Sequence, residues 1–193
     1  MARYLKTKTG AKIYLTRKRD KYLTLEQRNA FAVSNKADIF ISVHANASTN
    51  PAMTGIETYY LNNATDKAAE KLARRENAAS HKKLSDEEHI LSTMLQNVNT
   101  EESKTLALHV QGSLMKKMKS NYKNVKDRQL RSALFYVLVG AKCPAILVET
   151  SFISNKTEEE RLLDPKYQES VAAAIAEGVQ TYIKKNENYL AFR

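Results

Sequence analysis

The 193-residue chain contains one cysteine, no tryptophan, five glycines and three prolines. A single cysteine permits no internal disulfide bond, so cysteine usage does not indicate a cellular compartment. The low glycine and proline content excludes collagen-like and low-complexity proteins, and the hydrophobic content of 42% excludes a wholly disordered chain. A chain of this length is expected to form one domain, or one domain that carries an insertion.

Long hydrophobic runs are also absent. The longest apolar stretch covers residues 133–139, whereas a membrane-spanning helix needs about 18 apolar residues. The first four residues, Met-Ala-Arg-Tyr, lead into charged sequence and not into the apolar core of a signal peptide. We therefore expect neither a membrane span nor an export signal in this sequence.

Positive charge is abundant and is concentrated in two stretches. The formal net charge is +10. Residues 1–28 carry nine lysines and arginines against two acidic residues, and residues 112–131 carry seven against one. A basic surface of this kind can attract nucleic acid or the anionic polymers of a bacterial envelope, or it can be an ordinary solvated helix face. Because no nucleic-acid-binding motif is recognisable, we expect no nucleic-acid partner.

The pattern of apolar residues predicts strands that alternate with helices. Residues 37–43 are almost continuously apolar, which is typical of a parallel strand covered on both faces. Thr24 and Gln27 have the spacing of a capping box at the start of a helix. The expected strands are residues 12–17, 37–43, 55–61, 133–139 and 145–148, and the expected helices are 23–36, 66–79, 100–119 and a last helix that begins near Pro165.

This alternation predicts an α/β fold: a twisted, largely parallel sheet flanked by helices on both faces. About seventy residues between the third and fourth expected strands lack strand character and contain helical segments. We therefore expect a helical insertion at that point of the chain.

Two polar residues stand at the ends of apolar strands and are candidate site residues. His44 follows the strand 37–43, and Glu149 follows the run 145–148. Ligands of open α/β sheets bind beyond the carboxyl ends of the strands. A histidine there could bind a metal, transfer a proton or be a hydrogen-bonded core residue, and a buried glutamate could be paired with an arginine, protonated or metal-bound. Together they suggest hydrolysis with a metal-bound water and a glutamate base.

The remaining histidines and the cysteine are weaker candidates. His81 and His89 are eight positions apart, which is not the spacing of a metal-binding pair on a helix, and His109 lies within a long helix. Cys143 has no neighbouring residue that would lower the pKa of its thiol. We interpret all four as surface or packing residues.

Six segments resemble the zinc-dependent N-acetylmuramoyl-L-alanine amidases of bacterial cell-wall turnover, and with the last helix they cover nearly the whole chain in the family's order. The resemblance implies that residues 1–193 form a single amidase catalytic domain with Zn²⁺ as cofactor. It also implies hydrolysis of the amide bond between the lactyl group of N-acetylmuramic acid and the L-alanine of the stem peptide. The six segments are Ile13–Arg17, Leu25–Arg28, Ala37–Asn46, Gly55–Leu61, Phe135–Leu138 and Pro144–Asn155.

The resemblance also implies roles for individual residues. His44 matches a zinc ligand of the family, and Glu149 matches its catalytic glutamate, which acts as general base and acid. Residues 62–113 resemble the regulatory insertion of cell-division amidases, in which a helix covers the zinc site until an activator protein displaces it. Glu76, or less directly Glu70, is the carboxylate expected to reach the metal in that resting state, with a solvated helix face as the alternative.

The sequence departs from the family at its start. The family opens with an apolar strand ending in Gly-His-Gly-Gly and then supplies a glutamate, and these residues provide two of its zinc ligands. Neither feature occurs here, so we expect an N-terminally truncated form of an active enzyme that acts on peptidoglycan in the periplasm or cell envelope. The alternative is an inactive truncated remnant that binds peptidoglycan without zinc, and metal analysis separates the two.

Overall fold

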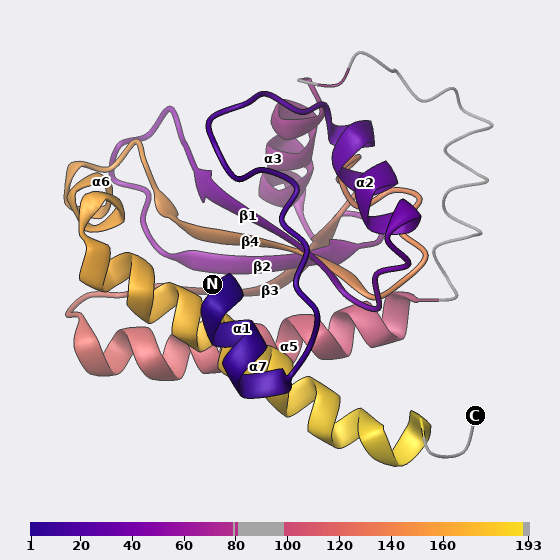
Figure 1. Cartoon of the computed structure of the whole chain (residues 1–193). Helices are drawn as coiled ribbons and strands as arrows, with labels where there is room; N and C mark the ends of the chain where they lie inside the picture. The colour runs from indigo at the N-terminus through magenta and orange to yellow at the C-terminus, as the bar shows by residue number, and fades with distance from the viewer. Residues whose placement is uncertain (79, 81–98, 191–193) are drawn as a thin grey trace.

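The structure, a computed structural model, describes residues 1–78, 80 and 99–190 and has an α/β architecture. Within these residues four strands form one twisted sheet (Figure 1). The β1–β4 and β2–β3 pairings are parallel and the β2–β4 pairing is antiparallel, which confirms the largely parallel sheet. In spatial order the strands are β1 (Phe40–Asn46), β4 (Ala145–Phe152), β2 (Ile56–Leu61) and β3 (Asp127–Ala133).

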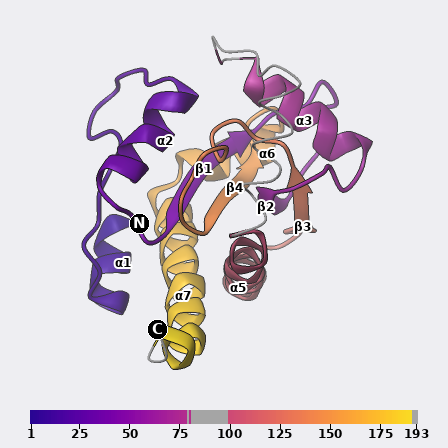
Figure 2. The same cartoon turned by 90° about the vertical axis from the view of Figure 1, so that its right-hand side faces the viewer.

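Helices cover both faces of this sheet, as the sequence predicts (Figure 2). One core lies between the sheet and α1, α5 and α7, and the other lies between the sheet and α2 and α3. The short helix α6 follows β4 and leads into α7. The helices are α1 (Ala2–Thr9), α2 (Leu25–Ser34), α3 (Lys67–Asn77), α5 (Thr100–Asn121), α6 (Lys156–Leu163) and α7 (Pro165–Leu190).

Strand β4 is the most buried element, since all eight of its residues are buried. Its side chains alternate between the two faces. Ile146 and Val148 contribute to the core under α5 and α7, whereas Leu147 contributes to the core under α2 and α3. Glu149 is two residues from Leu147 and therefore faces the α3 side of the sheet.

Helix starts follow the local sequence signals. Thr24 and Gln27 form the predicted capping box of α2, in which each side chain bonds to the other residue's backbone N–H. Asp66 caps α3 by accepting hydrogen bonds from the backbone of Ala68 and Ala69. The last helix begins at Pro165 as expected, because proline fits the first turn.

Two expected strands are wrong. Residues 12–17 form no strand in the described structure, and Tyr14 and Leu15 are exposed. Residues 134 and 135 have no regular structure and residues 136–140 form turns, with the amide of Leu138 donating to the carbonyl of Phe135. The side chain of Phe135 is nevertheless fully buried. An apolar run reports burial and not backbone conformation, so it is ambiguous between a strand and a packed turn.

Strand β3 is absent from the sequence-based expectations because its residues are polar. Its seven residues include Asp127, Arg128 and Arg131, and it is an edge strand of the sheet. Gln129 has a φ of 69°, and the pairing with β2 shifts register opposite this point. Both features indicate a β-bulge, which interrupts the alternation that sequence reasoning relies on.

The connection between β2 and β3 is helical, as expected for the insertion, and contains α3 and α5. Residues 79 and 81–98 of this connection, including His81 and His89, lie outside the described residues. The expected boundary at residue 113 falls within the continuous helix α5. No helix in the described ranges is both long and apolar enough to cross a membrane.

Close packing of α7 on α5 generates a stability prediction. A Cβ atom at Gly178 would lie 2.5 Å from the Cα of Val110, whereas a Cβ at Gly112 would meet nothing within 4 Å. We expect Gly178→Ala to lower the free energy of unfolding by about 1–3 kcal/mol through overpacking. The control Gly112→Ala should raise it by about 0.5–1 kcal/mol, because alanine favours the helix. Urea denaturation measures both, and equal stabilities for the two variants would contradict the predicted packing.

Candidate functional site

The two candidate residues from the sequence lie side by side at one end of the sheet. His44 of β1 and Glu149 of β4 are register partners in the parallel pairing. Because partners in adjacent strands point to the same face, both side chains lie on the side covered by α3. Both residues lie in the second half of their strands, towards the carboxyl ends at Asn46 and Phe152, where α/β proteins bind ligands. The structure therefore brings together the two residues that sequence analysis singled out.

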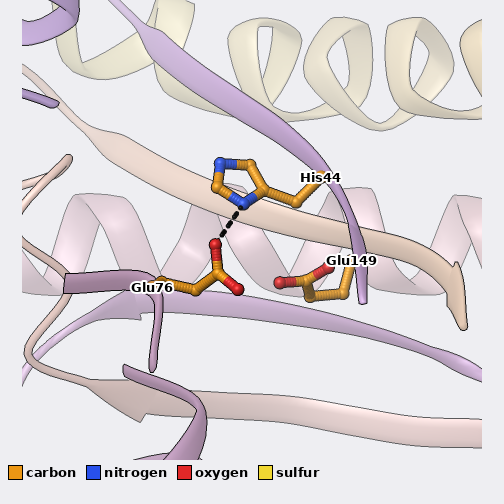
Figure 3. A group of neighbouring side chains, drawn as sticks. All are labelled: His44, Glu76 and Glu149. Atoms are coloured by element: carbon orange, nitrogen blue, oxygen red, sulfur yellow. Dashed lines mark ion pairs between the residues drawn. The ribbon is translucent and has the colours of Figure 1, made fainter. Parts of the chain in front are cut away.

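A third residue, Glu76, reaches this point from the last turn of α3 (Figure 3). The Nδ1 atom of His44 lies 3.2 Å from the Oε2 atom of Glu76. The Nε2 atom of His44 lies 3.0 Å from the hydroxyl of Ser42, so both ring nitrogens are engaged. The hydrogen bond from His44 lowers the pKa of the Glu76 carboxyl, against the opposing effect of burial.

Glu149 is the most unusual group in the site. Its side chain is fully buried, and neither carboxylate oxygen has a hydrogen-bond partner among the described residues. Burial raises the pKa of Glu149 well above its ordinary value, and the nearby charges of Glu76 and Glu57 raise it further, whereas Arg75 acts in the opposite direction. An ionised carboxylate in such a position is unfavourable unless a proton or a cation accompanies it.

These three residues fit a metal ion. The candidate ligand atoms of His44, Glu76 and Glu149 all lie within 4.8 Å of one another. One imidazole nitrogen and carboxylate oxygens belong to the donor set that zinc accepts in proteins. The unpartnered oxygens of Glu149 and the His44–Glu76 pair are therefore compatible with a zinc ion at this end of the sheet.

A buried polar network that sequence reasoning missed lies next to these residues. The Nδ2 group of Asn46 donates to Oε1 of Glu57 at 2.7 Å. The Oε2 atom of Glu57 lies 3.1 Å from Nε of Arg128 and 3.7 Å from Nε of Arg131. Glu57 itself, an acidic residue in an otherwise apolar strand, is the sequence signal that could have revealed this network. Its arginine partners lie on strand β3, which the sequence did not predict.

The other candidate residues lie apart from the site. Glu70 is exposed on α3 and pairs with Arg74 one turn later, at 2.6 Å, so the structure does not bring it to His44. Cys143 is buried, and burial raises the pKa of its thiol to about 11, in agreement with a packing role. His109 lies half-buried on α5, where burial lowers its pKa.

The chain is similar to cell-wall amidases in both sequence and structure. The sequence model of the family described as N-acetylmuramoyl-L-alanine amidase (Amidase_3) matches residues 1–181. N-acetylmuramoyl-L-alanine amidase AmiA of Escherichia coli K12 is 36% identical over 191 residues, which cover 94% of this chain and 64% of AmiA. AmiC of Escherichia coli O6:H1 is 35% identical over 89% of this chain and 42% of AmiC. The chain thus spans less than two thirds of the length of these relatives.

Solved structures agree with this similarity. The amidase AmiC2 of Nostoc punctiforme matches with a TM-score of 0.66 and 25% identity, over 94% of this chain and 79% of that chain. The catalytic domain of the amidase CwlV from Bacillus (Paenibacillus) polymyxa matches with a TM-score of 0.59 and 28% identity, over 95% of this chain and 80% of that one.

Burial of Glu149 generates a pH-dependent prediction for the metal-free protein. The pKa of Glu149 is raised in the folded chain relative to about 4.3 in the unfolded chain. Its contribution to stability is therefore fully present below pH 4 and is lost as the pH rises through the folded pKa. We expect Glu149→Gln to increase the free energy of unfolding by about 1–3 kcal/mol at neutral pH, with a smaller gain near pH 4.

Urea denaturation in the presence of a chelator, at several pH values, measures this difference. The exposed Glu70, mutated to glutamine, is the matched control and should show no comparable increase with pH. A stability gain for Glu149→Gln that shrinks as the pH rises would contradict the assigned environment of this carboxyl group.

Proposed function

Because the chain belongs to the N-acetylmuramoyl-L-alanine amidase family, we propose that it hydrolyses peptidoglycan at the amide bond between the lactyl group of N-acetylmuramic acid and the L-alanine of the stem peptide. The observation that carries this proposal is the buried, unpartnered carboxylate of Glu149 beside the imidazole of His44. A basic chain of formal net charge +10 also suits a substrate in the anionic bacterial envelope. We place the protein in the periplasm or cell envelope.

In this proposal His44 is a zinc ligand, and Glu76 fills a second ligand position in the resting state. A bound zinc ion lowers the pKa of water towards 7 and polarises the substrate carbonyl. The proximity of the three candidate ligand atoms supports this assignment. Ser42 holds the other nitrogen of the His44 ring, which keeps the imidazole in one orientation.

Glu149 is the proposed general base and acid. Its carboxylate takes a proton from the attacking water as the oxygen adds to the amide carbon. It then delivers that proton to the nitrogen of the leaving L-alanine as the carbon–nitrogen bond breaks. The raised pKa of Glu149 supports this role, because a carboxylate with a raised pKa is a stronger base towards the proton of the attacking water. The products are a lactyl carboxylate and the free amino group of the stem peptide.

Helix α3 is proposed to be an autoinhibitory element within a regulatory insertion at residues 62–113. Its Glu76 lies against His44, and the preceding residue, Arg75, contacts Asn46 at the end of β1 and Ala47 just after it. Substrate can reach His44 and Glu149 only if the end of α3 moves away. An activator protein that binds this insertion would supply the displacement.

Substitution of the two principal residues separates their roles. We expect Glu149→Gln to retain zinc but to lower the rate of stem-peptide release from sacculi by about 10²–10⁴-fold, because proton transfer is lost. We expect His44→Ala to lose both zinc and activity. Chromatography of released peptides and elemental analysis of the purified protein measure the two properties, and Glu159→Gln, an exposed carboxylate on α6, is the control.

Metal content also distinguishes this proposal from its alternative. An unmodified 193-residue chain that binds sacculi, holds no stoichiometric zinc and releases no stem peptide would be a binding remnant and not an amidase. Zinc in the wild-type chain that is lost on His44→Ala favours the enzyme.

Removal of Glu76 tests the autoinhibitory role. We expect Glu76→Ala to raise the basal rate of hydrolysis about fivefold or more, because His44 is then released from its resting partner. Glu70→Ala, six residues earlier on the same helix, removes only the exposed pair with Arg74 and should leave the rate unchanged. Unchanged rates for both variants, or loss of activity in Glu76→Ala, would show that Glu76 does not occlude the site.

A further inference from the structure

The side-chain amide of Asn46 has a defined orientation. Asn46 and Glu57 are 3% and 2% exposed, and the amide nitrogen of Asn46 donates to Oε1 of Glu57 at 2.7 Å. Glu57 forms ion pairs with the adjacent Arg128 and Arg131, and a carboxylate in an ion pair can only accept hydrogen bonds. The nitrogen of Asn46 must therefore face Glu57, and its oxygen Oδ1 must face the opposite side.

That oxygen is one of two neighbouring acceptors at the end of β1. Nη2 of Arg75 donates to Oδ1 of Asn46 at 3.0 Å, and Nη1 of the same guanidinium donates to the backbone carbonyl of Ala47. Both acceptors lie within three residues of His44. The acceptors are neutral, so Arg75 meets them as a pair of N–H donors and not as an ion-pair partner.

We propose that Oδ1 of Asn46 and the carbonyl of Ala47 bind backbone N–H groups of the stem peptide, and that Arg75 occupies these acceptors in the resting state. This inference rests on the proposed function, since it assigns part of the substrate to a subsite beside His44 and Glu149. A stem peptide carries amide N–H groups next to the bond to be cleaved. Two acceptors beside the catalytic residues would orient that peptide while the amide carbonyl reacts.

The same geometry predicts competition between α3 and the substrate. Arg75 is bound to the acceptors only as long as the end of α3 lies over β1, and its side chain is 42% exposed. A substrate must displace the guanidinium from both acceptors before its own N–H groups can bind to them. Loss of the Arg75 side chain therefore frees the subsite without altering Asn46 and Ala47, although it also removes the 3.1 Å ion pair between Arg75 and Glu76.

The test measures binding to the metal-free protein, so that it does not depend on hydrolysis. The probe is N-acetylmuramoyl-L-alanyl-D-isoglutamine, and isothermal titration calorimetry gives its Kd in the presence of a chelator. We expect Arg75→Ala to lower the Kd by roughly three- to tenfold, which corresponds to about one hydrogen bond gained. The matched control is Arg74→Ala, because Arg74 precedes Arg75 on the same helix and pairs only with Glu70 among the described residues.

A modified ligand and a substitution of the buried Asn46 test the two acceptors independently. In a second probe a methyl group replaces the hydrogen on the amide nitrogen that joins L-alanine to the second stem residue. We expect this ligand to bind Arg75→Ala about three- to tenfold more weakly than the unmodified probe. Asn46→Ala in the Arg75→Ala background should remove most of the gain in affinity.

Three outcomes would overturn the inference. Equal affinities of Arg75→Ala and Arg74→Ala would show that Arg75 does not occupy a substrate subsite. Equal binding of the two probes to Arg75→Ala would show that the acceptors do not bind the peptide N–H group, for example because they bind a sugar hydroxyl instead. In both cases zinc-dependent hydrolysis of sacculi could still stand. If no variant bound the muramyl peptide, the proposed substrate and this subsite would both be wrong.

Discussion

The site depends on one buried carboxyl group whose two oxygens have no hydrogen-bond partner among the described residues. Glu149 lies within the central strand β4, where every residue is buried, and its oxygens have no partner among the described residues. The fold tolerates this group because the remainder of β4 contributes to both hydrophobic cores. A carboxyl group in such surroundings favours a proton or a cation, and proton transfer beside a bound metal is the chemistry that the proposed amide hydrolysis uses.

The register partner of Glu149 on β2 shows the contrasting case. Glu57 lies directly opposite Glu149 and is equally buried, yet Arg128 and Arg131 stand beside its carboxylate and Asn46 donates to it. Two carboxylates on neighbouring strands thus have different roles that their surroundings decide. The paired one is structural and orients Asn46, and the unpaired one remains available for chemistry.

Much of this arrangement could be predicted from local sequence. The apolar strand before His44, the capping box at Thr24 and the helix at Pro165 depend on residues near one another in the chain, and all three are present in the structure. Strand β3 could not be predicted, because its charged residues and its bulge at Gln129 hide the strand pattern. The apolar run after Ala133 was misleading for the converse reason, since packed turns and strands bury the same residues.

The sequence by itself determined the class of fold and the two residues, His44 and Glu149, that end its apolar strands, because burial and periodicity are local properties. Tertiary structure decided which carboxylate of α3 meets His44, since Glu76 and Glu70 lie on the same helix and differ only in which side of it approaches β1. It also decided that Arg75 covers Asn46 and that Glu57 is paired. These contacts join residues that are far apart in the sequence, so they depend on how the helices pack on the sheet and not on any local pattern.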